Sequence, residues 1–551
     1  MRDPAAQGRL PGLVLFAAFA LLAVPVLAVR MPPVLDYPNH FSRIWLLAGG
    51  VEAPPASGFY AVDWAGASTN IGTDVLAAAL GAAVPATVLA PLFLLAALVL
   101  PALGAAALNR AVFGGWHWWQ VGFAALAWST TFLAGFLNFQ IAIGLGALAA
   151  ALNPKVARLP PAAAFACRAG LGAVVLLFHP FGLLFYAAFL AGLALGRDWR
   201  VLGSARGVAR GGGRALLAAA AAAAPLVAVL LLAPALPGAQ AGAEVPAPEW
   251  APFSVGGKLD MLSSGVRTYW RGVDLVPVAL VAAPALWALA TGRLRAHAGL
   301  LLVAVGFVAL SVASPLHFRT GSWIAERFAA MAVMAMAAAL RPDPVLSRRA
   351  GAALAAALLA VSAGRTAMVG WVWRARQADV AAVERALAHL PAGAVLLPME
   401  HTPTEGGRHS APRGRYVHGV GAYWHLPTLA VPWRQAFVPT LFAMRGKQPV
   451  HMLPPWDALA AADGGPFTVS ALTSLTEDNA QDWVDKLKIP VRHVLGWRER
   501  YDYVLVLNAD LPDRAGPAGP VPGLELVADE GFAQLHRVVR GGSAAAAGSG
   551  G

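Results

Sequence analysis

The sequence predicts a polytopic α-helical membrane protein with about eleven transmembrane helices, a cytoplasmic N-terminus and a C-terminal periplasmic α/β domain. Three observations predict this fold class. Of the 551 residues, 58% are hydrophobic and only 13% are charged, about half the charged fraction of a soluble protein. Long apolar runs recur along the chain, and basic residues cluster between them. Because the net charge of +12 is distributed in this way, it indicates membrane topology and not nucleic-acid binding.

A span needs roughly 20 apolar residues, and a count of about ten to thirteen spans is compatible with the sequence. The expected spans are 11–28, 86–108, 118–134, 137–152, 164–179, 181–196, 214–235, 273–291, 298–314, 324–340 and 350–372. The first lacks the small-residue cleavage pattern of a signal peptide, so we expect it to be retained. The single cysteine, Cys167, excludes a disulfide within the chain.

The orientation follows from the basic connections, which alternate with connections poor in basic residues. The basic ones hold Arg2, Arg9, Arg110, Lys155, Arg158, Arg197, Arg200, Arg206, Arg210, Arg214, Arg293, Arg295, Arg341, Arg348 and Arg349. Placing them in the cytoplasm puts the N-terminus inside, and an odd number of spans puts the C-terminus outside. The sequence therefore predicts a multi-pass membrane protein whose C-terminal region is external.

The chain divides into three regions by composition. We expect a transmembrane domain at 1–372, which includes a long first periplasmic loop at 29–85, an α/β domain at 373–540 and a disordered tail at 541–551. Within the loop, 70–85 is too short to span and predicts a helix at the membrane interface. In the C-terminal domain, we expect a helix at 377–390, buried strands at 394–399, 493–497 and 501–508, and a hairpin at 524–539 with Gly531 near its turn.

The stretch LDYPNHFSRIW, residues 35–45, gathers Asp36, His40 and Arg43 just beyond the first span. A carboxylate at that place can take a proton from an acceptor hydroxyl or coordinate a metal. If a helix begins at Asn39, His40 and Arg43 share one of its faces. The alternative is that Asp36 is a solvated residue of a loop near the membrane.

This stretch, following a first helix, resembles the first external loop of the GT-C membrane glycosyltransferases, such as oligosaccharyltransferase catalytic subunits, protein mannosyltransferases and lipid A aminoarabinose transferases. The span count and the external C-terminal domain are also similar. NIGTDVLAAAL, FLAGFLNFQIAIGLG and LLFHPFG resemble patterns in uncharacterised bacterial proteins grouped with these enzymes. The resemblance implies that Asp36 is the catalytic carboxylate. The sequence departs from the family in two ways. A second acidic residue next to Asp36 is missing, although Asp63 and Asp74 in the same loop could substitute for it. The C-terminal signature of the oligosaccharyltransferases is also absent.

The resemblance implies a sugar donor linked to a polyprenyl phosphate, whose phosphate needs cations near the outer membrane boundary. The candidates for this contact are Arg43, Arg319, Arg327, Arg365, Lys258 and Arg271. Arg365 lies inside the last expected span, where an unpaired arginine is costly, and snorkelling to the surface is the alternative.

Further residues are candidates for lining the same cavity, with packing as the alternative. They are Asp74, Asn138, His179, His317, Glu400, His401, Tyr416 and His418. The C-terminal stretch 399–425, with His401, His409, His418 and His425, predicts a Gly-rich surface loop that helps to bind the acceptor. Its histidines lack the tight spacing of a zinc site. A divalent metal, Mg²⁺ or Mn²⁺, is compatible with the resemblance but not required by it.

The resemblance implies inverting transfer of a sugar from a polyprenyl-phosphate donor to a cell-envelope glycan, lipid or protein at the periplasmic face of a bacterial inner membrane, with Asp36 as base and His40 beside it. Membrane lipids are the expected surroundings. One alternative is a transporter or flippase of lipid-linked saccharides, for which inverted repeats are expected but not found in the sequence. The other is a non-catalytic partner in envelope assembly.

Overall fold

The computed structural model describes most of the chain. The described residues are 4–65, 67–196, 203–232, 250, 254–318, 321–343, 346–403, 411–443, 448–461, 464–487, 490–512, 514–515 and 520–540. The expected disordered tail, 541–551, lies outside them.

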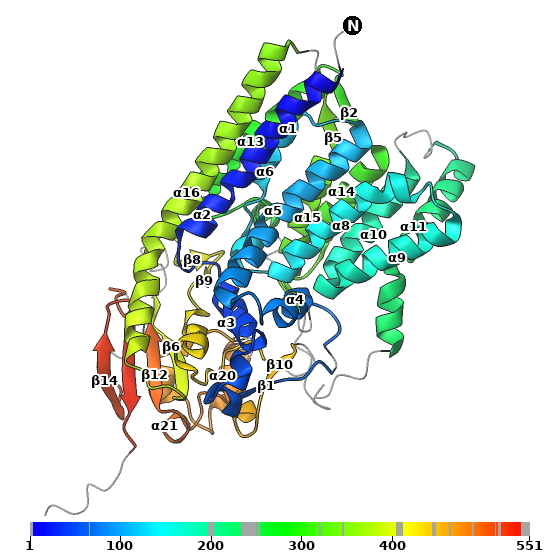
Figure 1. The fold of residues 1–551 in the computed structure, drawn as a ribbon. Helices are drawn as coiled ribbons and strands as arrows, with labels where there is room; N and C mark the ends of the chain where they lie inside the picture. Colours follow the sequence, from blue (N-terminus) through cyan, green and yellow to red (C-terminus); the bar gives the residue numbers. More distant parts are fainter. Residues whose placement is uncertain are drawn as a thin grey trace, which may run out of the picture. The chain divides into compact units, whose positions relative to one another are not determined.

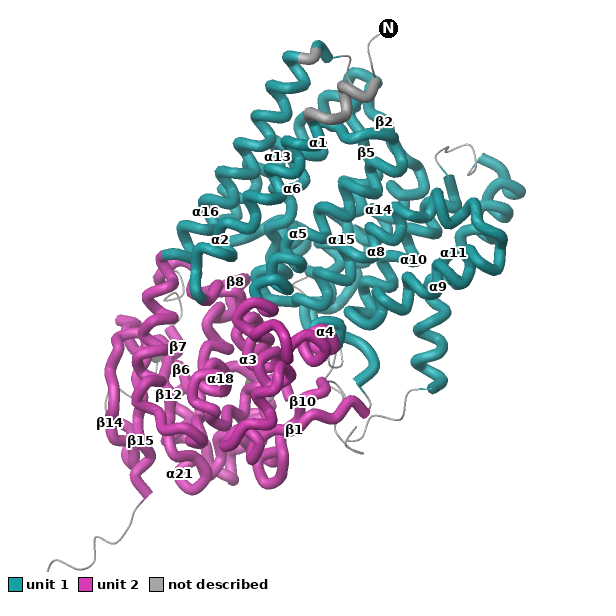
Figure 2. Tube along the Cα trace, in the orientation of Figure 1, with its two compact units in different colours: residues 1–30, 66–73, 91–374 teal, residues 31–65, 74–90, 375–551 magenta. Residues whose placement is uncertain are grey.

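The chain forms two compact units, coloured in Figure 2. Unit 1 contains residues 1–30, 66–73 and 91–374, and unit 2 contains residues 31–65, 74–90 and 375–551. The units are therefore not separated by a single cut near residue 372. Most of the first loop belongs to the same unit as the C-terminal region.

Unit 1 consists mainly of helices (Figure 1). They are α1 (Pro4–Leu21), α2 (Ala23–Ala28), α5 (Ala86–Phe113), α6 (Phe123–Leu126), α7 (Thr130–Leu133), α8 (Leu137–Val156), α9 (Pro161–Phe178), α10 (Pro180–Leu195), α11 (Ala205–Leu232), α12 (Val255–Ser263), α13 (Arg271–Ala290), α14 (Ala298–Ala313), α15 (Ile324–Ala339) and α16 (Arg348–Ala388). The first residues of α5 and the last residues of α16 belong to unit 2. Close packing of α10 and α14 depends on glycine, because a Cβ at Gly299 would overlap the carbonyl oxygen of Gly192.

Seven helices in the described part of the chain are long and apolar enough to cross a membrane. They are Pro11–Ala28, Ala86–Phe113, Leu137–Val156, Pro161–Phe178, Ala205–Leu232, Arg271–Ala290 and Arg349–Ala388. Two further apolar helices, α10 and α14, are shorter. Large side chains such as Leu231 (78% exposed) and Leu286 (63% exposed) point outward from these helices. Apolar side chains on the outside of apolar helices are what lipid contact requires, so the protein is a helical membrane protein.

The expected span at 118–134 is wrong. This stretch forms a 3₁₀ helix, Trp118–Gly122, followed by the short helices α6 and α7, and it is buried throughout. Two polar caps interrupt it. His117 and Gln120 form a capping box at the first turn, and the Ser129 hydroxyl accepts the backbone N–H of Phe132. Side chains that bond locally to the backbone favour helix starts over a continuous helix.

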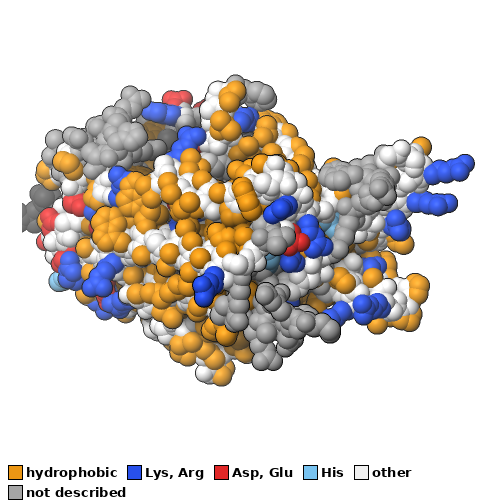
Figure 3. All heavy atoms as spheres, turned by 90° about the horizontal axis from the view of Figure 1, so that it is seen from above, with side chains coloured by type: hydrophobic (Ala, Val, Ile, Leu, Met, Phe, Trp, Pro, Cys, Tyr) orange, Lys and Arg blue, Asp and Glu red, His pale blue; other side chains and the backbone are white. Residues whose placement is uncertain are grey.

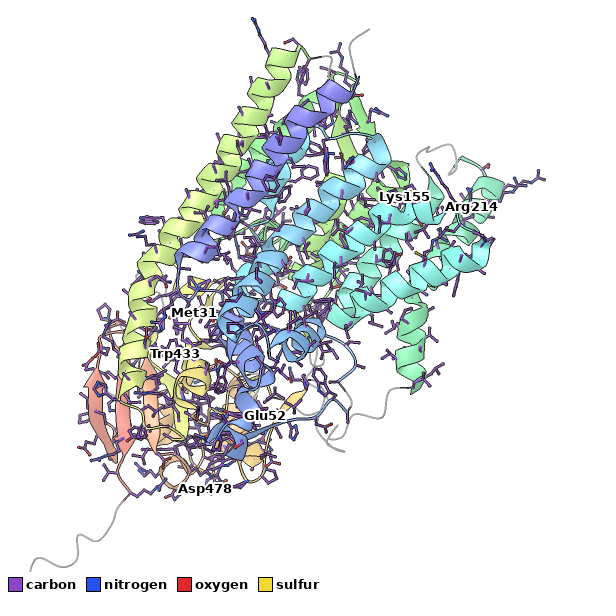
Figure 4. All side chains as sticks on the ribbon, in the orientation of Figure 1. Met31, Glu52, Lys155, Arg214, Trp433 and Asp478 are labelled. Atoms are coloured by element: carbon purple, nitrogen blue, oxygen red, sulfur yellow. The ribbon has the colours of Figure 1, made fainter. Side chains whose placement is uncertain are left out.

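The basic connections of unit 1 gather at one end of its helices, where Figure 4 labels Lys155 and Arg214. The strands β2 (Leu294–Ala296) and β5 (Leu340–Pro342) pair there, and Arg341 donates to the carbonyl oxygens of Phe113 and Gly114. On the face shown in Figure 3, Lys and Arg side chains are plainly more frequent than Asp and Glu. The gathering is compatible with the predicted orientation, which stays a prediction.

Unit 2 contains a five-stranded sheet in the order β11-β6-β12-β15-β14. Its strands are β6 (Leu396–Glu400), β11 (Phe467–Thr468), β12 (Tyr503–Leu507), β14 (Leu524–Asp529) and β15 (Ala533–Val538). The strand β6 is parallel to β11 and β12, whereas β15 is antiparallel to β12 and β14. A separate pair joins β1 (Tyr60–Val62) to β10 (Val450–Met452). The C-terminal region is therefore α/β, and a piece of the first loop pairs with it.

The smaller elements of unit 2 surround these strands. They are α3 (Tyr37–Leu47), most of α4 (Gly72–Leu80), α18 (Ala430–Arg434), α19 (Ala471–Ser474), α20 (Ala480–Leu487), α21 (Trp497–Arg500), the 3₁₀ helices Gly50–Glu52, Ala56–Gly58, Leu426–Leu429 and Trp456–Leu459, and the short strands β7 (Thr402–Pro403), β8 (Tyr416–Val417), β9 (Val420–Gly421) and β13 (Arg514–Ala515). Met31, labelled in Figure 4, bonds through its backbone to the side chain of Gln377.

Most sequence predictions for the C-terminal region are confirmed. The strands at 396–400 and 503–507 form, as does the hairpin with Gly531 in its turn at positive φ. The helix at 377–390 forms as the end of α16. The strand expected at 493–497 is wrong, because Gly496 has φ 57° and the chain turns there into α21.

Candidate functional site

The helix α3 presents the residues of the LDYPNHFSRIW stretch. It begins at Tyr37, two residues before the expected start, with Pro38 in its first turn, where a missing N–H costs nothing. Asp36 precedes the first helical residue, but its side chain does not cap the helix. The Asp36 side chain is 15% exposed. The Asp36 carboxylate is therefore partly accessible at the first turn of a buried helix.

Positions 36, 39, 40 and 43 lie on one face of α3, as helical spacing requires. Asn39, His40 and Arg43 are buried on this face. The Arg43 guanidinium donates to both carboxylate oxygens of Asp74, at 2.6 Å from Nε and 3.1 Å from Nη2. The same Nη2 lies 3.3 Å from Nδ1 of His40. The expected common face of His40 and Arg43 is therefore present, and the structure brings Asp74 to it.

The Arg43–Asp74 pair is buried, with 2% and 0% of the two side chains exposed. Burial raises the pKa of the Asp74 carboxyl, and the charge of Arg43 opposes that rise. A bidentate pair of this kind holds α4 against α3. The structure thus pairs the Arg43 guanidinium with the Asp74 carboxylate, and the roles of both residues in the site stay predictions.

His425 joins this face from a segment 386 residues away from Asn39 in the sequence. Its Nε2 lies 3.5 Å from Oδ1 of Asp36, and its Nδ1 lies 3.2 Å from Nδ2 of Asn39. The imidazole packs edge-on against Phe442. Burial lowers the pKa of His425 to about 3, so the ring is neutral at ordinary pH.

Sequence reasoning did not assign His425 or Asn39 to the site. His425 was one of several histidines in a stretch expected to be a surface loop, and Asn39 looked like a helix start. No local signal identifies the pairing, because it depends on where the chain folds back.

In unit 1, the structure brings together two other expected residues, His179 and Arg327. His179 caps α10, since its Nδ1 accepts the N–H of Phe181, and its Nε2 lies 3.4 Å from Nη1 of Arg327. The guanidinium lies over the Phe136 ring at 4.0 Å and near the Phe139 ring at 5.0 Å. An arginine held by aromatic rings beside a histidine is a suitable anion-binding group.

Arg365 is buried within unit 1 and does not snorkel to the surface. Its guanidinium donates to the carbonyl oxygens of Ala125, at 2.7 Å, and of Trp128 and Val266, and it pairs with Asp274 at 3.2 Å. With these partners, Arg365 joins three segments of unit 1. The burial of the Arg365 side chain argues against the snorkelling alternative, whereas the phosphate contact stays a prediction.

The remaining cationic candidates of unit 1 lie around α12. Lys258 is partly buried on that helix. Arg271 is 52% exposed, and its Nη1 is 3.4 Å from Asp260, which also pairs with Arg267. Arg319 lies outside the described residues. These groups remain proposals for phosphate binding.

Two further polar candidates, Asn138 and His317, lie in hydrogen-bonded parts of unit 1. The Asn138 amide accepts the N–H of Thr73 and donates to the carbonyl of Asn70, so it fastens this part of the loop to α8. His317 belongs to β3 (His317–Phe318), which pairs with β4 (Gly321–Ser322).

Among the candidates in the C-terminal region, Glu400, His401 and Tyr416 lie near Tyr423, whereas His418 lies in a turn. The Tyr423 hydroxyl lies 3.1 Å from Glu400 and 3.1 Å from the Tyr416 hydroxyl, and His401 is buried next to Glu400 in the chain. His418, with φ 51°, and the following glycine form the two-residue turn between β8 and β9. His418 therefore has a conformational role.

The stretch 399–425 is not a surface loop over its described residues. Arg415, 4% exposed, forms paired hydrogen bonds with Asp379 and with Asp510, and it lies over the Phe532 ring. Residues 404–410, with His409, lie outside the description. Within the described part of the chain, no three His, Cys, Asp or Glu side chains gather in a way that could hold a metal.

An apolar groove of about 380 Å³ lies in unit 1 between α1 and α5, lined by Leu15, Phe19, Leu103 and Trp116. Arg110 stacks on the Trp116 ring at 4.5 Å. The groove is therefore at the basic end of unit 1, whereas the expected donor site requires one at the other end.

The chain matches no protein-family model, no curated protein and no solved structure.

Proposed function

We propose that this protein is a membrane glycosyltransferase. It transfers a sugar from a polyprenyl-phosphate donor to a hydroxyl of a cell-envelope glycan, lipid or protein, on the periplasmic side of a bacterial inner membrane. The observation that carries the proposal is the position of Asp36, a partly exposed carboxylate at the start of a buried helix, a few residues beyond an apolar span and 3.5 Å from an imidazole nitrogen.

In the proposed reaction, Asp36 accepts the proton of the acceptor hydroxyl as its oxygen attacks the anomeric carbon. The new carbon–oxygen bond forms on the face opposite the phosphate, the bond from the sugar to the phosphate oxygen breaks, and the configuration inverts. The lipid phosphate leaves with the electron pair. Arg327, with His179, and the cations around α12 are the groups of unit 1 that we propose for binding a phosphate. The apolar outer surface of unit 1 suits a lipid-linked substrate.

The test uses the purified full chain in lipid nanodiscs with a labelled polyprenyl-phosphate sugar and an extract of cell-envelope acceptors. Release of free lipid phosphate and labelling of an acceptor are measured for the wild type, Asp36→Asn and Asp63→Asn. Removing a general base costs about 10²–10⁴-fold in rate. We expect Asp36→Asn to show this loss. Asp63→Asn is the matched control, because Asp63 lies in the same loop at an exposed site, where its carboxylate accepts the backbone N–H of Ala65.

Full transferase activity in Asp36→Asn, at an equal level of folded protein, would sink the proposal. Movement of the intact donor across the bilayer without release of lipid phosphate would instead identify a transporter.

A further inference from the structure

The side-chain amide of Asn39 has only one possible orientation. Its Oδ1 accepts the backbone N–H of Phe442 at 2.7 Å, and its Nδ2 donates to the backbone carbonyl of Thr440 at 2.8 Å. Reversing the amide would set donor against donor and acceptor against acceptor at both backbone groups. The atom facing His425 is therefore the amide nitrogen.

This orientation determines the tautomer of His425. An amide nitrogen can only donate, so Nδ1 of His425, 3.2 Å away, accepts. The ring is neutral because burial lowers its pKa to about 3. A neutral imidazole carries one proton, and with Nδ1 as the acceptor that proton is on Nε2.

The protonated Nε2 is the ring atom nearest to Asp36, at 3.5 Å from Oδ1. Two further titratable groups on α3, His40 and Arg43, are close to this contact. The His40 ring also packs edge-on against Phe442, with ring centroids 6.0 Å apart, and Arg43 is held by Asp74 one turn further along. The Asn39 amide thus donates to Nδ1 of His425, and the protonated Nε2 on the other side of the ring faces the Asp36 carboxylate.

We propose that His425 is a positioning residue for Asp36, and that Asn39 sets its tautomer. The Nε2–H donates to Oδ1, orients the carboxylate and favours its ionised form, which is the form that a base needs. The inference rests on the proposed function for its catalytic meaning. The hydrogen-bond chain itself can be tested without a substrate.

The first measurement is the pH dependence of carbodiimide labelling at Asp36, which requires the protonated carboxyl and is followed by peptide mass spectrometry on the full chain in nanodiscs. Loss of a donor to a carboxylate raises the pKa of the carboxyl. For a contact of this length we expect His425→Phe to move the labelling midpoint upward by about half to one pH unit. His425→Gln, which can place an amide N–H near the lost Nε2, is expected to shift it less.

Two further variants separate positioning from general damage. Asn39→Asp replaces the donor by an acceptor, reverses the tautomer and is expected to raise the midpoint as well. His493→Gln is the matched control, because His493 is a buried histidine of unit 2 that packs against Phe467, away from α3. We expect no shift in this control.

An unchanged Asp36 midpoint in folded His425→Phe would overturn the inference. If His425→Phe does not fold, the tautomer is measured directly by NMR. The ring-nitrogen chemical shifts of the ¹⁵N-labelled wild type are recorded, and the His425 signals are assigned by their loss in His425→Gln. A proton on Nδ1 of His425 would refute the inference. The two proposals fail separately. If His425→Phe shifts the labelling midpoint of Asp36 but Asp36→Asn is still active, then Asp36 is not the base, and the hydrogen bond from His425 to Asp36 is still supported. If Asp36→Asn is inactive but His425→Phe shifts neither the labelling midpoint of Asp36 nor the acid limb of the pH–activity profile, then only the role of His425 is refuted.

Discussion

Unit 1 exposes large apolar side chains along its helices, whereas unit 2 covers most of its apolar side chains and carries charged groups on its surface. Among the described residues, the most exposed leucines, such as Leu230, Leu231 and Leu232 on α11, belong to unit 1. The exposed apolar side chains of unit 2 are few and include Leu76 and Leu80 on α4. Since α4 was expected to lie at the membrane interface, its exposed leucines suit that proposal. The difference indicates that the surface of unit 1 is suited to lipid and that most of the surface of unit 2 is suited to water.

Buried charges show a second difference between the units. In unit 1, the Arg365 guanidinium bonds to three backbone carbonyls and one carboxylate. In unit 2, Arg415 and Arg43 bond mainly to carboxylates. Each of these arginines is paired, because an unpaired buried charge costs several kcal/mol in either unit. The following three predictions are ordered from the largest expected effect.

Removal of Arg415 would test the ionic network of unit 2. The Arg415→Ala change leaves the carboxylates of Asp379 and Asp510 without their main cation, and breaking a buried pair costs about 3–5 kcal/mol. We expect a loss of that order in the free energy of unfolding, with exchange protection lost first in unit 2. Arg537→Ala is the control, since Arg537 and its partner Glu525 are both more than half exposed. An effect of Arg415→Ala no larger than that of the control would contradict the network's role.

A charge on the outer surface of each unit would test the difference in solvent directly. Leu280, midway along α13, is 49% exposed, and Leu526 on β14 is 51% exposed. An arginine at the centre of a spanning helix costs about 2.5–3.5 kcal/mol on insertion scales. Leu280→Arg is therefore expected to reduce membrane insertion, measured as the fraction of protein that resists carbonate extraction, whereas Leu526→Arg should leave it unchanged. Equal behaviour of the two variants would show that α13 does not contact lipid.

The pH dependence of stability would test the buried histidines of unit 2. Burial lowers the pKa of His425 to about 3 and that of His493 to about 4. The unfolded chain binds these protons near pH 6.5, so stability is complete above that pH and falls as the pH drops toward the folded-state values. Between pH 7.5 and 5, each histidine should cost about 2 kcal/mol. Thermal unfolding of the wild type and of His493→Leu checks this, because the variant should lose less stability on acidification. The same acid sensitivity in both would refute the assignment for His493.

The sequence predicted local features well. Apolar runs such as 11–28 and 137–152 appear as helices, since a run of that length and composition can be stable only across a membrane or inside a core. The hairpin around Gly531 also follows from local pattern, because alternation and a turn glycine are encoded within a few residues.

Other predictions failed where distant contacts decide the outcome. The stretch 118–134 has the composition of a span, but its polar caps and its burial break it into short helices. The sequence also showed no sign that Arg365, inside an expected span, pairs with Asp274, 91 residues away. The position of the strands did not reveal that β1, from the first loop, pairs with β10.

The sequence alone determined that this chain is a helical membrane protein and that Asp36 follows its first span, because hydropathy and spacing are properties of neighbouring residues. Only the tertiary structure decided that Arg43 binds Asp74 and that His425 faces Asp36. Those contacts join residues far apart in the chain, and their formation depends on how α3, α4 and the 425–442 segment pack, which no local pattern specifies.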